Sequence, residues 1–131
     1  MNSDDLRGRG FVFWTRFNRK SESLVIQTAP EAEGVYAIRR TLPFDRARGG
    51  SDILYIGSAF NQVGGLRTRC RQYFHPGSSQ STNKRILALC GDCNDFEISF
   101  LTVKSAKGFE SDLLHLYEAD HGELPPENRR R

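Results

Sequence analysis

The stretch ILYIGSAF at residues 53–60 follows a second apolar stretch, GVYAI, at residues 34–38. Both are rich in the Tyr, Ile and Val residues that favour β-strands, and Gly57 is expected to end the later strand. Residues 41–52, between the two stretches, contain a proline and a glycine pair and therefore predict a loop. The two stretches thus predict an antiparallel pair of strands with a long connection.

The strand predicted at 33–40 has apolar side chains in both of its alternating sets. Val35 and Ala37 point to one face, whereas Tyr36 and Ile38 point to the other. Strands that are apolar on both faces are typical of sheets covered on both sides. This strand is therefore expected at or near the centre of the sheet.

The rest of the chain predicts further helices and one more strand. Leu66, Cys70 and Tyr73 recur at helical spacing and form one apolar stripe. Thr82 or Asn83 is a candidate N-cap for the following helix. The predicted elements are extended segments at 11–17 and 23–29, strands at 33–40, 53–57 and 95–103, helices at 64–74, 78–90 and 105–122, and an extended tail.

The last predicted helix carries Phe109, Leu113, Leu116 and Asp120 on one stripe and ends at Gly122. Its stripe gives a second helix that can cover the sheet. Three antiparallel strands flanked by helices make a small α+β fold.

The chain has 131 residues, which is enough for one hydrophobic core. Residues 31–131 are assigned to the α+β domain described above. Residues 1–30 form an N-terminal extension with an extra extended segment, which is expected to pack on that domain.

The net charge is only +3, but the charged residues are unevenly distributed. Arg67, Arg69 and Arg71 lie close together, the chain ends with three arginines at 129–131, and acidic residues gather in the last third. This asymmetry suits a face that contacts phosphates. Solvated surface is the ordinary alternative for such charged runs.

The sequence also indicates a compartment. It has no apolar run long enough to cross a membrane and no secretory signal at its start. Three cysteines cannot form a complete set of disulfides, which indicates a reducing, cytoplasmic setting. Cys90 and Cys93 have the spacing of half a zinc knuckle, but no matching second pair is present, and plain packing or surface thiols explain them better.

Four residues are not required by this fold. Arg69 lies at the rim of an apolar helix stripe, Glu110 begins a helix beside apolar residues, and Tyr36 and Tyr55 lie inside strands. Each has an ordinary explanation, because arginines extend over helix edges, a glutamate suits a first helical turn, and tyrosines occur in cores. Their combination is more informative than any one of them.

GVY at 34–36, YIG at 55–57, Arg69 in GLRTRCRQYF, Glu110 in FESDLLHLY and Asn128 in LPPEN occur in this order along the chain. Their order and approximate spacing resemble those of the GIY-YIG nuclease family, including its homing and restriction-type catalytic domains. The resemblance covers about three quarters of the chain and implies a divalent-metal-dependent endonuclease that cuts DNA.

The resemblance also implies roles for individual residues. Tyr36 would act as general base, Tyr55 would position water or phosphate, and Arg69 would hold the non-bridging oxygens. Glu110 would bind one Mg²⁺ or Mn²⁺ ion, which takes hard oxygen ligands. The predicted catalytic residues are Tyr36, Tyr55, Arg69, Glu110, Tyr73, His75 and Asn128, and the predicted substrate-binding residues are Gly57, Ser58, Arg67, Arg71 and Lys84.

The chain departs from the family pattern in several places. Ser58 follows YIG where many members have Lys, and Tyr73 stands where others have His. His75 is either a substitute for that histidine or a surface residue. His115 and His121 are expected on the helix surface. The insertion at 41–52, with two arginines, is either a DNA-contacting loop or a tolerated surface insertion.

DNA, double-stranded or branched, is the expected partner, and no membrane is expected. The alternative function is a nucleic-acid-binding domain of the same fold with little or no catalytic activity. Cleavage specificity is expected to come from the 41–52 loop, the N-terminal segment, a homodimer or a targeting partner protein.

Overall fold

The computed structural model describes residues 1–129 of the chain. Arg130 and Arg131 of the basic tail lie outside the described residues. Within residues 1–129, no helix combines the length and the apolar character needed to cross a lipid bilayer. The elements in chain order are α1 (Ser3–Arg7), β1 (Thr15–Arg16), the 3₁₀ turn η1 (Arg19–Ser21), α2 (Glu22–Thr28), β2 (Gly34–Asp45), β3 (Gly50–Ala59), α3 (Gly65–Phe74), α4 (Ser81–Cys90), β4 (Phe96–Thr102) and α5 (Ala106–His121).

The strands form one antiparallel sheet with the order β1-β4-β2-β3. The predicted α+β class is therefore confirmed, with four strands instead of three. The fourth strand is the short β1, where Thr15 pairs with Ile98 at the edge of β4. β2 lies inside the sheet, as expected, and β3 is an edge strand.

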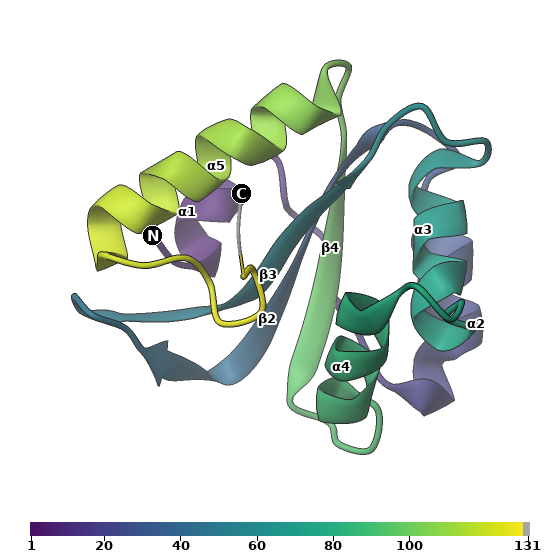
Figure 1. Cartoon of the computed structure of the whole chain (residues 1–131), viewed down its shortest axis with the longest axis horizontal. Helices are drawn as coiled ribbons and strands as arrows, with labels where there is room; N and C mark the ends of the chain where they lie inside the picture. The colour runs from purple at the N-terminus through teal and green to yellow at the C-terminus, as the bar shows by residue number, and fades with distance from the viewer. Residues whose placement is uncertain (130–131) are drawn as a thin grey trace.

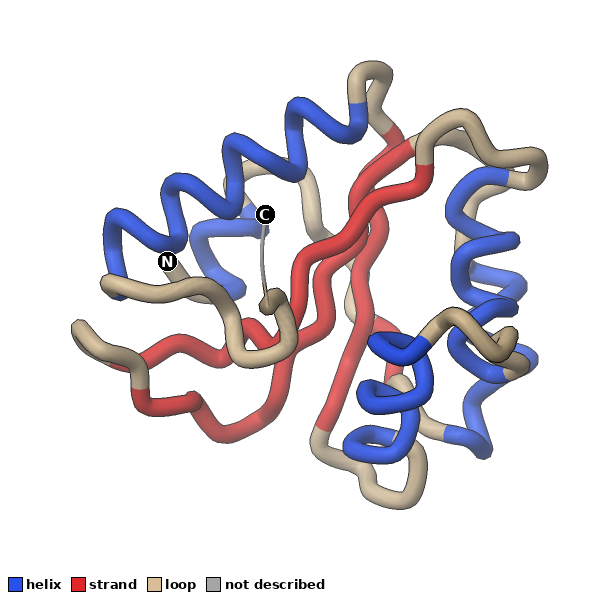
Figure 2. Tube along the Cα trace, in the orientation of Figure 1, coloured by secondary structure: helices blue, strands red, loops and turns tan. Residues whose placement is uncertain are grey.

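Helices cover both faces of the sheet (Figure 1 and Figure 2). α1 and α5 lie on one face, and α2, α3 and α4 lie on the other. Val35 and Ala37 belong to the core beneath α5, whereas Tyr36 and Ile38 belong to the core beneath α3 and α4. The prediction that this strand is covered on both faces is confirmed.

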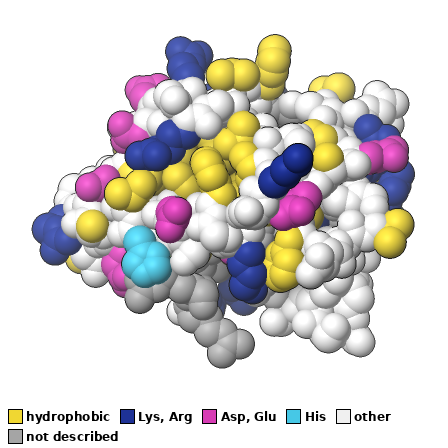
Figure 3. Space-filling model, turned by 90° about the horizontal axis from the view of Figure 1, so that it is seen from above, with side chains coloured by type: hydrophobic (Ala, Val, Ile, Leu, Met, Phe, Trp, Pro, Cys, Tyr) yellow, Lys and Arg dark blue, Asp and Glu magenta, His cyan; other side chains and the backbone are white. Residues whose placement is uncertain are grey.

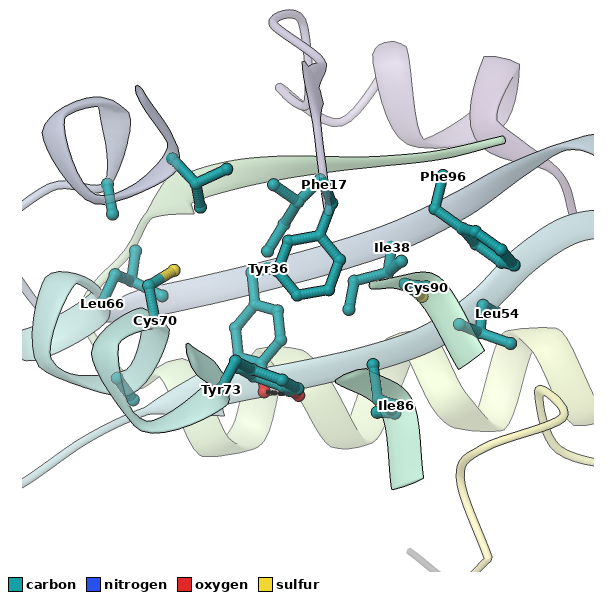
Figure 4. Packing of buried hydrophobic residues seen from close by; sticks show 14 residues of the cluster. Phe17, Tyr36, Ile38, Leu54, Leu66, Cys70, Tyr73, Ile86, Cys90 and Phe96 are labelled. Carbon is teal, nitrogen blue, oxygen red and sulfur yellow. Dashed lines mark hydrogen bonds between the residues drawn. The ribbon is translucent and has the colours of Figure 1, made fainter. Parts of the chain in front are cut away.

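The N-terminal 30 residues take part in both cores. Leu6 and Phe11 pack into the core on the α5 side. Phe17, Val25 and Ala29 pack into the other core, where Figure 4 shows Phe17 close to Tyr73. This segment therefore helps to cover both faces of the sheet.

Parts of the N-terminal prediction were wrong. Residues 22–28 form helix α2 instead of an extended segment, because Val25 and Ala29, one helical turn apart, are both fully buried. Only residues 15–16 of the segment 11–17 form a strand. Helix α1 was not predicted, although Asn2 and Asp5 form a capping box that is visible in the sequence.

The predicted loop at 41–52 is largely strand. β2 continues to Asp45 and β3 begins at Gly50, so the connecting turn contains only residues 46–49. The register shifts between Arg39 and Phe44, and the extended hairpin therefore leaves the regular ladder around the proline. Pairing across strands is a non-local interaction, which explains why turn-forming residues alone were misleading.

Two helix predictions need correction in detail. The buried face of α5 carries Ala106, Leu113, Leu114 and Tyr117, whereas Leu116 is 41% exposed. Asp120 is also exposed, so the predicted stripe was rotated by about one position. In α4 the N-cap is Gln80, and the buried Asn83 amide instead donates to the Gln72 carbonyl at 3.4 Å.

The segment after α5 covers the free edge of β3. The Glu127 N–H donates to the Leu54 carbonyl at 3.1 Å. The Asn128 side chain accepts a hydrogen bond from the Ile56 N–H at 2.9 Å and donates to the Ile56 carbonyl at 2.8 Å. A side-chain amide thus takes the place of a neighbouring strand at this edge.

Candidate active site

Residues from four elements meet beside the middle of β3. Tyr36 comes from β2, Tyr55 from β3, Arg69 from α3 and Glu110 from α5. Arg69 influences the ionisation of both tyrosines and of Glu110, so the four groups share one electrostatic environment. Because β3 is an edge strand, side chains from helices on opposite faces of the sheet can meet there.

Three tyrosines form the inner wall of the site. The hydroxyls of Tyr36 and Tyr73 are 2.6 Å apart, and both side chains are buried (Figure 4). Their rings meet edge to face at 5.8 Å between centroids. The ring of Tyr55 lies 6.0 Å from that of Tyr36 and is only partly buried. The aromatic wall therefore runs from the core, at Tyr73, to the surface, at Tyr55.

Gly57 is essential to this wall for a steric reason. It pairs directly with Tyr36 across the two strands. A Cβ atom on Gly57 would lie 2.5 Å from both Cζ and the hydroxyl oxygen of Tyr36. The missing side chain thus lets the Tyr36 ring lie across β3. Gly57 is inside β3 and not at its end, which corrects the prediction that it terminates the strand.

Arg69 supplies a positive charge next to the tyrosines. The pKa of Arg69 is raised, mainly by its electrostatic interaction with Tyr36, so the guanidinium stays charged. Its Nε atom is buried and has no hydrogen-bond partner among residues 1–129. A buried donor without a partner costs free energy, and an anionic ligand would satisfy it.

Glu110 reaches the site from the other face of the sheet. Burial raises the pKa of its carboxyl group, against the opposing effects of the Ser58 hydroxyl, Lys107 and Arg69. Ser58, which follows YIG, is thus among the groups that favour the charged form of this carboxyl group. Lys107 lies one turn before Glu110 on the same helix, α5, and adds a positive charge near the carboxyl group.

The tyrosine hydroxyls are protonated at neutral pH. Burial raises the pKa of Tyr36 well above its ordinary value, and the nearby Tyr55 raises it further. Tyr73 is also shifted upward by burial. Burial raises the pKa of Tyr55 as well, although Arg69 opposes this shift. The positive charge of Arg69 therefore reduces the upward shift at Tyr36 and Tyr55 without cancelling it.

Glu110 is the residue that suits a metal ion. Within residues 1–129 there is no cluster of three or more His, Cys, Asp or Glu side chains. A single half-buried carboxylate with a hydroxyl beside it fits Mg²⁺, which typically takes one or two protein carboxylates and completes its shell with water and substrate phosphate.

A cleft opens next to Tyr55. It has a volume of about 490 Å³ and is lined by Tyr55, by Ser81, Thr82 and Arg85 of α4, and by residues 127–129. Asn128, held on Ile56, forms part of its wall. Asn128, predicted as a catalytic residue, therefore lies beside Tyr55, where its hydrogen bonds to Ile56 fix it against β3.

Several predicted residues lie elsewhere. The His75 ring is exposed at the end of α3 and contacts the Glu22 carboxylate at 2.7 Å. Arg67 pairs with Glu31 and donates to the Ala29 carbonyl, which ties α3 to the N-terminal segment. Arg71 and Lys84 are exposed. Among residues 1–129, none of these four side chains forms a hydrogen bond or ion pair with the tyrosine wall, so their predicted roles remain predictions.

The sequence did not single out Arg85, Lys107 or the burial of His121. In the sequence, Arg85 and Lys107 fall on the polar faces of their helices, and their neighbours in the chain do not distinguish them from solvated surface charges. His121, predicted on the surface, is buried and shares a 2.8 Å hydrogen bond with the Arg48 carbonyl. That contact comes from a residue far away in the sequence.

Comparisons with known proteins agree with this geometry. No family model matches the chain. In sequence, the chain is 38% identical over 73 residues to UvrABC system protein C of Gloeobacter violaceus. The match covers 56% of this chain but only 9% of that protein, so the chain corresponds to a small part of the relative.

Solved structures give the same result. The chain is similar to the GIY-YIG N-terminal endonuclease domain of UvrC from Thermotoga maritima, in a point mutant bound to its catalytic divalent cation. The TM-score is 0.50 and the identity 22%, over 85% of this chain and 98% of that domain. The magnesium-bound form of the same domain matches with a TM-score of 0.49. The chain therefore has the fold of the GIY-YIG endonuclease domain, and its predicted resemblance to the GIY-YIG nuclease family is confirmed.

Proposed function

We propose that this chain is a divalent-metal-dependent endonuclease that hydrolyses DNA phosphodiester bonds at the edge of β3. The observation that carries the proposal is the meeting of Glu110 and Arg69, which approach from opposite faces of the sheet beside Tyr36 and Tyr55. The similar domain of known structure is named as an endonuclease and holds a catalytic divalent cation. These similarities do not favour the alternative of a binding domain without activity.

Arg69 is the residue that binds the scissile phosphate. Its guanidinium is permanently charged, partly desolvated, and has a buried donor without a partner. Such a group stabilises the charge that grows on the non-bridging oxygens during hydrolysis. It lies beside Tyr36 and Tyr55 at the edge of the sheet, where we expect a DNA backbone to reach it.

Glu110 is the ligand proposed for a single Mg²⁺ or Mn²⁺ ion. A bound ion acts as a Lewis acid toward the leaving oxygen. The desolvated carboxylate gains from a cation, because burial alone penalises its charged form. Ser58 favours the charged form of this carboxylate and so supports its proposed role as a ligand.

Tyr36 orients the attacking water through its hydroxyl. Because its pKa is raised, the phenol is protonated in the free protein, and it hydrogen-bonds Tyr73 in the buried core. The remaining hydrogen-bonding capacity of the hydroxyl faces Arg69 and Tyr55. Accepting a proton from water would require further positive charge near Tyr36. Tyr73 fixes the orientation of Tyr36 and acts as a positioning residue.

DNA is the proposed substrate, bound through specific contacts more than through a broad basic surface. Seen from above, the Lys and Arg side chains are spread among hydrophobic and acidic ones (Figure 3). Several arginines, among them Arg19 and Arg39, are also paired with carboxylates. A cytoplasmic setting, in which its free thiols remain reduced, and a homodimer or targeting partner remain parts of this proposal.

The test is nicking of supercoiled plasmid in Mg²⁺, in Mn²⁺ and in EDTA, with the parent chain and with Glu110→Gln. We expect metal-dependent nicking by the parent and none by the variant, which should still bind DNA. Arg69→Lys should lose about 10²–10³-fold in rate, because a lysine cannot reproduce the planar fork. DNA binding without cleavage by the parent chain would contradict the proposal and support the binding-domain alternative.

A further inference from the structure

The cleft beside Tyr55 contains an arginine whose bonding is incomplete. Arg85 of α4 donates from Nε to the Glu127 carboxylate at 2.5 Å. Its Nη2 atom is buried and has no hydrogen-bond partner among residues 1–129. Nε and Nη2 share one edge of a guanidinium, so Glu127 faces that edge. The Arg85 side chain is 32% exposed and lines the cleft, which leaves the rest of the guanidinium available to a second anion.

Other groups in the cleft suit the same ligand. Ser81 and Thr82, in the first turn of α4, line it with hydroxyls, and Arg129 adds a second guanidinium. Hydroxyls and arginines are the side chains that bind phosphate oxygens. Glu127 is the acidic exception, and its charge is already matched by Arg85.

The cleft and the proposed active site share Tyr55. Tyr55 belongs to both, because its ring lies beside Tyr36 and also lines the cleft. The charge of Arg85 influences the Tyr55 hydroxyl, as does that of Arg69. Two guanidinium groups thus lie near enough to affect the same tyrosine hydroxyl.

We propose that this cleft binds a phosphate group that flanks the scissile phosphate in the same DNA strand, with Arg85 as its main ligand. A strand carries one phosphate per nucleotide, so a strand held at Arg69 presents the next charge to a neighbouring site. The contact fixes which direction the cut strand runs across β3. This inference rests on the proposed function.

A purely structural role for Arg85 makes a different prediction. If Arg85 serves only to hold the C-terminal segment through Glu127, then Arg85→Gln and Glu127→Gln break the same ion pair and have similar effects. If Arg85 binds phosphate, only Arg85→Gln weakens DNA binding. Arg85→Gln removes the ligand, whereas Glu127→Gln frees the guanidinium from a competing carboxylate.

The experiment measures binding of a fluorescent DNA duplex in EDTA, as a function of salt, for the parent chain, Arg85→Gln and Glu127→Gln. We expect Arg85→Gln to weaken binding about tenfold and to lower the slope of log affinity against log salt by about one. Glu127→Gln should bind as tightly as the parent or more tightly. Arg16→Gln is the matched control, since Arg16 is exposed on β1 at the opposite edge of the sheet.

Thermal melting must show that each variant is folded. If Arg85→Gln is not, Arg85→Lys replaces it and should keep the salt slope while losing affinity, because the charge remains and the fork does not. Equal losses in Arg85→Gln and Glu127→Gln, or a loss in Arg85→Gln no larger than in Arg16→Gln, would overturn the inference. Plasmid nicking by the parent chain is scored separately, so a failed subsite and a failed nuclease are told apart.

Discussion

At the scale of single residues, the steric role of Gly57 differs from the role that the sequence suggests. The family resemblance implies that Gly57 contacts the substrate, whereas in the structure its missing side chain leaves room for the Tyr36 ring. An aromatic ring lying over a glycine on the neighbouring strand also protects a weak point of the sheet. The YIG motif and the GVY motif therefore depend on each other physically.

Gly57→Ala should displace Tyr36 and impair the site. The new methyl group would lie 2.5 Å from the Tyr36 hydroxyl, and the buried ring has no free space to move into. We expect nicking to fall by about 10²-fold and the free energy of unfolding to fall by about 1–3 kcal/mol. Gly108→Ala is the control, because its added methyl group meets nothing within 4 Å. Equal activity of the two variants would contradict this account of Gly57.

At the scale of elements, the extended hairpin between β2 and β3 is fastened to the end of α5. Arg46 pairs with Glu123 at 2.7 Å and donates to the Leu124 carbonyl at 2.7 Å. Arg48 donates to the Ala119 carbonyl at 2.6 Å. Because both arginines are bonded within the protein, a structural role for the insertion is favoured over a DNA-contacting role.

Arg46→Ala should destabilise the protein without weakening DNA binding specifically. The side chain is only 12% exposed, and its loss leaves a carbonyl and a carboxylate without their partner. We expect urea unfolding to report a loss of about 1–3 kcal/mol. Duplex affinity should change no more than in Arg16→Gln. A large loss of affinity with unchanged stability would show that the hairpin contacts DNA.

The C-terminal segment behaves as a short extra strand made partly of side chain. Asn128→Ala removes both hydrogen bonds to the Ile56 peptide group. We expect a loss of about 1–3 kcal/mol in the free energy of unfolding and faster hydrogen exchange at the Ile56 amide. The Leu54 carbonyl, which is bound by backbone instead, serves as the internal comparison. Unchanged protection at Ile56 would contradict this description.

At the scale of the whole molecule, buried tyrosines and thiols make stability depend on alkaline pH. Burial raises the pKa of Tyr36 and Tyr73 above the ordinary value, and raises that of Cys70 from 9.0 to about 12. These groups ionise earlier in the unfolded chain, so the folded chain holds more protons there. Their stabilising contribution is complete below about pH 9 and is lost as the pH rises toward 12.

Urea unfolding between pH 8 and pH 11 checks this dependence. Each group that ionises only in the unfolded chain lowers the free energy of unfolding by about 1.4 kcal/mol per pH unit. Tyr73→Phe removes one such group and should give a shallower decline than the parent above about pH 10. The same decline in both proteins would show that Tyr73 does not contribute.

Local patterns and ordered motifs predicted much of this molecule. The two-sided strand around Tyr36, the stripe of α3 and the convergence of Arg69 with Glu110 all follow from spacing and from the family resemblance. Helix α2 and the hairpin did not, because burial of Val25 and pairing across strands override local preference. Arg85 was invisible, since its partner Glu127 comes from a distant segment.

The edge position of the site has a consequence for the timing of synthesis. The guanidinium belongs to α3, but the carboxylate belongs to α5, and the amide that braces β3 follows still later in the chain. A copy still emerging from the ribosome therefore carries the phosphate-binding group without its metal ligand. Under the proposed function, a copy that ends before α5 would lack the metal ligand that cleavage requires.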